Sequence, residues 1–189
     1  VLALMTFDPD LITTRIVVQC HEEASAAALA RVTGGQVTTI VSDEVVGRLA
    51  AQACRQRGLS TTYQELFDFS GSEIYFAAFP ELVGATFAQA VLAFDRVAVL
   101  GLRHADGRVE LAPDPTTVIG VDDQLVGVAE DDATFTLTAV PAAANLPEIV
   151  DPPSLAERAP EHFLFAGWSP VATVILRELD AYVGTGSTM

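Results

Sequence analysis

A glycine turn near the end of the chain is the first place where the residue types suggest ligand chemistry. The run Gly167-Trp168-Ser169-Pro170-Val171-Ala172 matches a dinucleotide-binding G-x-G-x-x-G/A motif at its first glycine and last alanine. Ser169 replaces the glycine that a pyrophosphate approaches most closely, and Pro170 removes an amide donor. Gly167 and Ser169 are the candidate cofactor-binding residues, and a tight strand-to-helix turn packed by Trp168 is the alternative.

Acidic side chains are concentrated in the middle of the chain. Residues 70–136 contain eleven acids and three arginines, a net charge of −8 within a total of −15. Oxygen-rich clusters suit hard cations such as calcium. The candidate metal ligands are therefore Asp122, Asp123, Glu130, Asp131 and Asp132. No Asp-x-Asp-x-Asp-Gly loop is present, so solvated surface and turn residues are the alternative.

Nucleophilic and zinc chemistry are not indicated. Cys20 and Cys54 have no Cys-x-x-Cys spacing and are expected to be reduced cytosolic thiols. His21, His104 and His162 are isolated in sequence, which is typical of surface or packing histidines. All ten basic residues are arginine, which excludes a lysine nucleophile, a Schiff base and a Walker-type lysine. We expect no catalytic residues and no enzyme.

Charge and hydropathy exclude further classes of protein. A net charge of −15 repels nucleic acid and anionic bilayers. The uncharged apolar stretch at residues 163–176 is too short to span a membrane. No signal-peptide pattern opens the chain, and its start at Val1 suggests a fragment of something longer. The 189 residues, half of them apolar, suffice for one ordinary domain or two small ones.

The elements that would position these residues begin with an alternating pattern. Residues 15–20 are predicted to form a buried strand, residues 22–32 a helix, and residues 37–41 a second strand. Ser42 is expected to cap a further helix that ends at Gly58. Strand, helix, strand, helix is a parallel crossover pattern, so the fold class is α/β with half of a Rossmann-like doubly wound sheet.

The helices that follow carry more apolar surface than half a sheet covers. Thr61, with Gln64 three residues later, is predicted to cap a short helix. The candidate interface residues on these helices are Val45, Val46, Leu49, Tyr63, Leu66 and Phe67. An interface between subunits is the preferred interpretation, and burial under an upstream half-sheet is the alternative.

From Gly71 the pattern becomes that of a small α+β module. The predicted order is a strand, a helix, a hairpin with an Asp106-Gly107 turn, and a last strand, at residues 73–79, 86–94, 97–103 with 108–111, and 124–129. A buried strand at residues 162–168 and a helix capped by Ser169 are expected to open a second Rossmann-like unit. The predicted domains are residues 1–69, the module 70–136, a proline-rich linker 137–160, and residues 161–189.

Several of these motifs, in this order, resemble Castor/Pollux-type ion channels. Gly71 to Phe76, the turn Leu82-Val83-Gly84, the Asp106-Gly107 hairpin and Asp122 to Asp132 look like the middle region of that family. Phe165 to Trp168, followed by Leu179 to Val183 and Gly186-Ser187, resembles the start of the second RCK domain, a TrkA-like unit that regulates potassium conductance. Ser42 to Leu59 is similar to the later half of the first RCK domain.

The resemblance implies a cytosolic gating-ring region of a cation channel. RCK units would pair into dimers and build a homo-oligomeric, tetrameric ring at the cytoplasmic face of the cell membrane, below a transmembrane pore outside these residues. Calcium is implied as a possible effector, and any effector must bind two ring states unequally to shift them. Two alternatives remain open: a fragment of an NAD-dependent oxidoreductase, and a passive structural adaptor that binds no effector.

Overall fold

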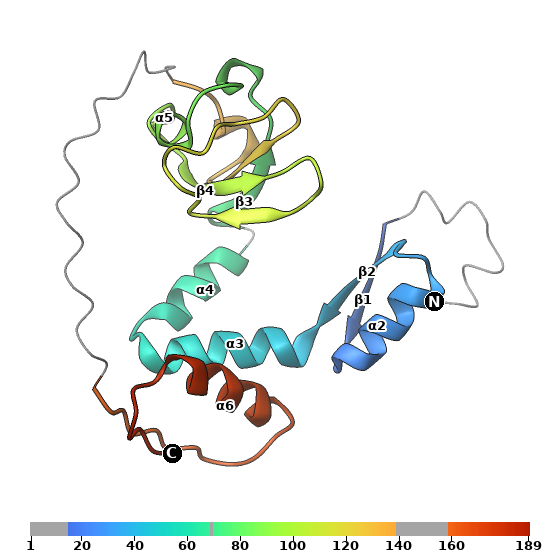
Figure 1. Ribbon diagram of the computed structural model, residues 1–189, viewed down its shortest axis with the longest axis vertical. Coiled ribbons are helices and arrows are strands. Elements are labelled where there is room, and N and C mark those ends of the chain that lie inside the picture. The colour runs from blue at the N-terminus through green and yellow to red at the C-terminus, as the bar shows by residue number, and fades with distance from the viewer. Residues whose placement is uncertain (1–14, 69, 139–158) are drawn as a thin grey trace. The chain divides into compact units, whose positions relative to one another are not determined.

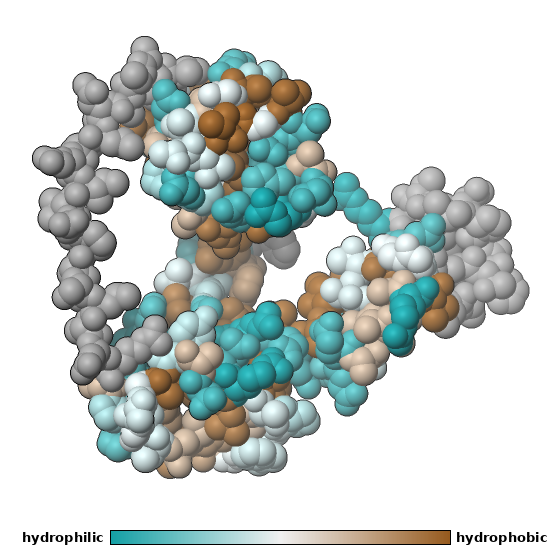
Figure 2. Space-filling view, in the orientation of Figure 1, coloured by the Kyte–Doolittle hydropathy of each residue, from teal (hydrophilic) through white to brown (hydrophobic). Residues whose placement is uncertain are grey.

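The computed structural model describes residues 15–68, 70–138 and 159–189, which are the coloured parts of Figure 1 and Figure 2. These residues form two compact units. The outer unit contains the described residues up to Ser60 together with residues 159–189. The middle unit contains the described residues from Thr61 to 138. The outer unit is therefore built from two stretches of chain, one before and one after the middle unit.

The outer unit begins with the predicted strand–helix–strand pattern. Strands β1 (Ile16–Cys20) and β2 (Val37–Val41) pair in parallel, and helix α2 (Glu23–Val32) connects them. Cys20, Val37 and Ala26 of α2 are buried. The structure confirms the expected crossover. β-branched residues favour the two strands, and the alanine-rich run favours the helix.

Helix α3 (Ser42–Arg55) follows β2 directly. Its N-cap residue is Val41, so the prediction that Ser42 caps this helix from outside is wrong. Ser42 is the first helical residue, and its hydroxyl donates to the backbone carbonyl of Cys20 at 3.3 Å. The serine thus ties the start of α3 to the end of β1.

The last described stretch contains helix α6 (Val171–Tyr182) but not the buried strand predicted at residues 162–168. Its pairing is limited to an isolated bridge between His162 and Thr188, and the Trp168 side chain is 76% exposed. An apolar run becomes a strand only when another strand pairs with it. Pro170 is the N-cap of α6 and no side-chain hydrogen bond caps the helix, so the prediction that Ser169 caps it is also wrong.

Helix α4 (Leu59–Phe67) leads into the middle unit. It begins two residues before Thr61, so the predicted cap at Thr61 is also wrong. The backbone N–H of Leu59 donates to the carbonyl of Gln56 at 3.3 Å, which starts this helix directly after the turn that ends α3. Leu59 is a stronger helix former than threonine, which favours the earlier start.

The middle unit contains a four-stranded antiparallel sheet and short helices. Its strands are β3 (Glu73–Ala77), β4 (Ala98–Arg103), β5 (Val109–Leu111) and β6 (Gln124–Ala129), in the spatial order β3-β6-β4-β5. The short helix α5 (Phe87–Val91) begins with a capping box between Thr86 and Gln89. The predicted strand, helix, hairpin and last strand are all present; β6 has the predicted bounds, and the other elements are shorter. The short helices η2 (Pro80–Leu82) and η3 (Asp132–Thr134) complete the unit.

An aromatic cluster lies at the centre of the middle unit. The rings of Phe79, Phe94 and Phe135 contact one another with centroids 5.0 to 5.4 Å apart. Gly127 of β6 lies under this cluster, and a Cβ there would be 2.8 Å from Phe135 Cζ. The core residues around the rings are Leu82, Phe87, Ala90, Leu102, Ile119, Leu125 and Ala129. This core holds the sheet and α5 together.

Candidate functional site: the α3–α6 helix pair

Helices α3 and α6 lie side by side although the middle unit separates them in sequence (Figure 1). The two helices approach closely at Gly47, where an added Cβ would be 2.5 Å from Val174 Cγ1 and 2.6 Å from Val174 Cβ. Ala51 of α3 and Leu179 of α6 are buried in the same contact region. A glycine in one helix thus forms the hole that receives a branched side chain from the other.

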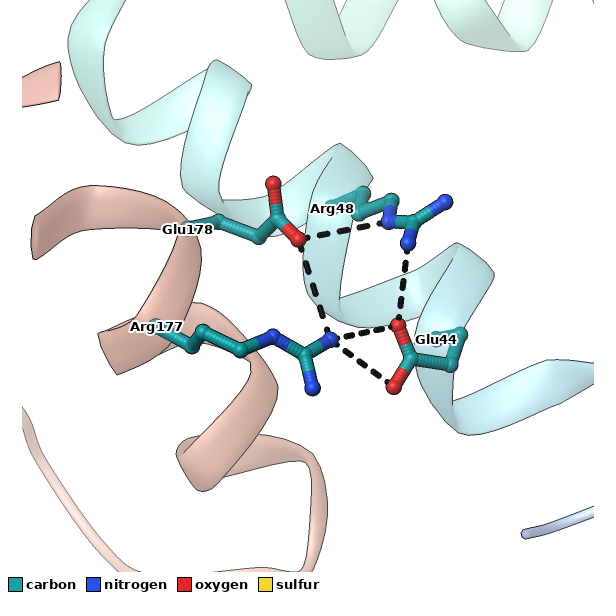
Figure 3. Close-up of polar contacts among 4 residues, drawn as sticks. All are labelled: Glu44, Arg48, Arg177 and Glu178. Atoms are coloured by element: carbon teal, nitrogen blue, oxygen red, sulfur yellow. Dashed lines mark hydrogen bonds and ion pairs between the residues drawn. The ribbon is translucent and has the colours of Figure 1, made fainter. Parts of the chain in front are cut away.

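Four charged side chains connect the same two helices (Figure 3). Arg177 Nη2 donates to both carboxylate oxygens of Glu44, at 2.6 and 2.9 Å. Arg48 reaches Glu44 at 3.3 Å through Nη2 and Glu178 at 3.3 Å through Nε. Arg177 also lies 3.7 Å from Glu178. Each carboxylate therefore lies between two guanidinium groups, one from each helix.

The electrostatics of this network favour the ionised forms. The hydrogen bond from Arg177 lowers the pKa of Glu44 below its ordinary value of 4.5, and Arg48 adds to this effect. The same hydrogen bond raises the pKa of Arg177. Both arginine side chains are more than half exposed, so water screens these pairs and each contributes little stability. The network therefore contributes more to the register of α3 against α6 than to the stability of their packing.

The candidate cofactor-binding residues lie in the turn before α6. Gly167 has a φ of +100°, which a glycine adopts without strain. The carbonyl of Ser169 accepts the backbone N–H of Ala172 at 2.9 Å. A dinucleotide-binding turn follows a strand, and residues 163–168 do not form one here. The observed geometry is that of a helix-starting turn beside an exposed Trp168.

The candidate metal ligands form two groups at opposite ends of β6. Asp122 and Asp123 precede this six-residue strand and residues 130–132 follow it, which separates the groups by roughly 20 Å. Asp123 accepts the backbone N–H of Gly120 at 2.9 Å, and Asp131 accepts that of Ala133 at 2.9 Å. Within the part of the chain that the structure describes, no group of three histidine, cysteine or acidic residues could hold a metal ion.

The candidate interface residues are divided between the two units. Val45 and Val46 are exposed on α3, beside Val17 and Ile40 on the open face of the β1–β2 pair. Leu49, on the same helix, is half-buried. On α4, Tyr63 and Phe67 contact each other with ring centroids 6.4 Å apart, Leu66 is half-buried, and Phe67 is 64% exposed. The structure thus shows two apolar patches, one on each unit.

The structure also brings together His104, Glu110 and Asp123, which the sequence analysis did not connect. His104 Nε2 lies 3.2 Å from Glu110 Oε2, and His104 Nδ1 lies 3.4 Å from Asp123 Oδ1. The contact with His104, followed by that with Arg108, lowers the pKa of Glu110. His104 and Glu110 flank the Asp106-Gly107 turn, so the hairpin pattern could have suggested their proximity. The position of Asp123 depends on how β6 pairs with β4.

Comparison with solved structures gives the fold. The human SLO3 gating ring matches 70% of this chain and 28% of its own chain, with a TM-score of 0.55 and 17% sequence identity. This likeness, together with the parallel and antiparallel sheets, confirms the predicted mixed α/β fold. No helix in the described ranges is long and apolar enough to cross a bilayer.

Sequence comparison gives the family. The family described as "Castor and Pollux, part of voltage-gated ion channel" matches residues 43–144, more than half of the chain, and the chain belongs to it. The probable ion channel POLLUX of Arabidopsis thaliana is 30% identical over 165 residues, 85% of this chain and 20% of that protein. The probable ion channel CASTOR of Oryza sativa subsp. japonica is 30% identical over 180 residues, 92% of this chain and 20% of that protein. The chain therefore spans about a fifth of these relatives, and the resemblance inferred from the motifs is confirmed.

Proposed function

We propose that this chain is a regulatory region of a Castor/Pollux-type cation channel and that the α3–α6 pair is its movable joint. The observation that carries the proposal is the family match over residues 43–144, which covers nearly all of α3 and the whole described middle unit. Helix α6 lies outside that match and packs back onto α3. The middle unit is thus connected by the chain, on both sides, to the same pair of helices.

A regulatory region needs two arrangements whose relative stability a ligand or partner can change. The α3–α6 contact suits this role because a close approach, at Gly47, is combined with ion pairs whose arginines are more than half exposed. Exposed ion pairs exchange with water at little cost, so the helices can shift or separate without leaving buried charges unpaired. Movement at this joint would change the packing within the outer unit.

The proposal extends to assembly and location. The region acts at the cytoplasmic face of the membrane, in a homo-oligomeric ring whose building block is a dimer. The exposed apolar residues Val45, Val46 and Phe67 support subunit contact. The curated relatives are named as ion channels rather than enzymes, so an oxidoreductase is not proposed.

A chimeric channel tests the proposal. The ion channel CASTOR of Lotus japonicus matches 178 residues, 92% of this chain, and this segment can be replaced by the present one. In planar bilayers the chimera should conduct, and Gly47→Val, which forces α3 and α6 apart, should change its open probability. The matched control is Arg31→Gln on α2, which should leave gating unchanged.

Two results would count against the proposal. Deleting the whole segment without any effect on gating would show that the region is not regulatory. Unchanged gating in a Gly47→Val chimera that reaches normal abundance and assembles normally would leave the region regulatory but remove the α3–α6 pair from the mechanism.

A further inference from the structure

A groove of about 360 Å³ lies between α3 and α6, next to the ion-pair network. Its floor is apolar, formed by the buried residues Ala51 and Leu179. Its rim is polar and is formed by Arg48, Gln52, Arg55, Gln56, Glu178 and Tyr182. An apolar floor with a few polar groups around it is the usual construction of a small-molecule site.

The rim has two chemically different ends. Arg48 and Arg55 are seven residues apart on α3, or about 10 Å along the helix, with Gln52 between them. At the Arg48 end, Glu178 neutralises the guanidinium at 3.3 Å. This end of the groove therefore offers an anion little net positive charge.

The Arg55 end is the cationic end. Its guanidinium carbon lies 5.6 Å from the centroid of the Tyr182 ring, which holds the side chain against the groove wall. Among the described residues, Arg55 pairs with Glu161 at 3.8 Å, longer than a hydrogen bond and longer than the 3.3 Å between Arg48 and Glu178. A guanidinium held over an aromatic ring presents a planar fork of N–H donors, which is suited to a carboxylate or phosphate.

We propose that this groove binds a small organic anion. The carboxylate or phosphate head lies on Arg55, with the amide groups of Gln52 and Gln56 beside it, and a short apolar body covers Ala51 and Leu179. Three of the ten arginines, at positions 48, 55 and 177, lie on these two helices in a chain of net charge −15. Such a ligand contacts both helices, so it would stabilise their packing. The inference concerns binding alone and does not depend on the proposed channel role.

Titration calorimetry of the 189-residue chain tests the site directly. Hexanoate is the probe that combines an anionic head with an apolar body, hexanamide is its uncharged control, and inorganic phosphate is the head without a body. We expect saturable one-to-one binding of hexanoate with a Kd on the order of 1 mM. Hexanamide and phosphate should each bind at least about tenfold more weakly, since each lacks one half of the interaction.

Matched arginine variants separate this site from general charge attraction. Arg55→Gln should weaken hexanoate binding by about tenfold, because the paired guanidinium is lost. Arg57→Gln removes the same charge two residues away, outside the groove lining, and should bind like the parent chain. Arg55→Lys keeps the charge without the planar fork, and its affinity should fall between the two. Circular dichroism establishes that each variant is folded.

Several results would overturn the inference. One is the absence of saturable hexanoate binding up to about 10 mM in the folded parent chain. Another is an equal loss of binding in Arg55→Gln and Arg57→Gln, which would show charge attraction without a site. Equal affinity for hexanoate and hexanamide would show that the groove is apolar only.

Discussion

Gly47 of α3 lies so close to Val174 of α6 that a methyl group at position 47 would overlap both Cβ and Cγ1 of the valine. The overlap involves the branched base of a short side chain rather than the end of a flexible one. Neither residue can move aside without shifting its helix, so the identity of residue 47 sets the distance between α3 and α6. Closely packed interiors transmit such changes instead of absorbing them.

Gly47→Ala should therefore destabilise the outer unit. Alanine is the better helix former by about 1 kcal/mol, and on an isolated helix the substitution would be stabilising. Here the overlap with Val174 should outweigh that gain, with a net loss of about 1 to 3 kcal/mol in the free energy of unfolding. Urea denaturation followed by circular dichroism measures the change.

A double-mutant cycle with Val174→Gly is the control for this prediction. Removing the valine side chain creates the space that the new methyl group needs, so the two substitutions should be strongly non-additive. Additive effects of Gly47→Ala and Val174→Gly would show that the two residues do not contact each other in solution.

The Glu44–Arg177 pair should make the outer unit sensitive to acid. Because Arg177 lowers the pKa of Glu44, this carboxylate stabilises the folded state above its ordinary value of 4.5, and the contribution is lost as the pH falls through the lowered pKa. The melting temperature of Glu44→Gln should lie below that of the parent at about pH 6, and the difference should shrink at about pH 3.

Asp180→Asn is the matched control for the acid response. Asp180 is an exposed acid on α6, and it is not one of the four side chains in the network. Its neutral variant should keep the acid response of the parent. The same acid response in Glu44→Gln as in the parent would contradict the assigned role of Glu44.

His104 should stabilise the middle unit. Its ring contacts carboxylates from two different segments, and the side chains of His104 and Asp123 are 18% and 11% exposed. His104→Ala leaves both carboxylates without this partner and should lower the melting temperature of the middle unit by roughly 4 °C or more. His21→Ala is the control, since His21 is 77% exposed and contacts Asp43 at the surface. Equal effects of the two substitutions on the melting temperature would show that the His104 contacts stabilise the protein no more than the surface contact of His21.

The apolar patch on α3 should mediate self-association. Light scattering at micromolar concentration should give an average mass above the 20.0 kDa of one chain. Val46→Asp places a charge in the patch and should restore the monomer mass, because Val46 is 52% exposed and the substitution leaves the core intact.

Leu164→Asp is the control for the association prediction. Leu164 is 94% exposed and lies outside the patch, so its variant should associate like the parent. A parent chain that is monomeric at every concentration would contradict the prediction, as would a Val46→Asp variant that associates normally.

Local patterns predicted most of the fold correctly. The strand–helix–strand crossover at residues 16–41 follows from β-branched and alanine-rich runs, and the Asp106-Gly107 turn specifies the β4–β5 hairpin. The strand predicted at residues 162–168 does not form. Its apolar composition is a local signal, whereas a strand also needs a pairing partner that can lie far away in the sequence. Cap positions failed by one or two residues at Ser42 and Thr61, where neighbouring residues also favour a helix.

Only part of the candidate site could be predicted from the sequence. Glu44 and Arg48 have the i, i+4 spacing of a helical ion pair, which is a local signal. Their partners Arg177 and Glu178 lie on α6, and 133 residues separate Arg177 from Glu44. From the sequence alone, Gly47 is only a poor helix former, and its packing role follows from the contact with Val174 in the structure. Contacts between helices that are distant in sequence depend on packing that no single segment encodes.

The chain contains one tryptophan, and the structure places it in the outer unit, directly before α6. The Trp168 indole lies against Phe165, with ring centroids 6.1 Å apart. Indole emission excited at the red edge of the absorption band therefore comes from this unit alone, while the middle unit is optically silent. The polarisation of that emission can follow the freedom of α6 separately from the melting of the sheet, without any attached dye.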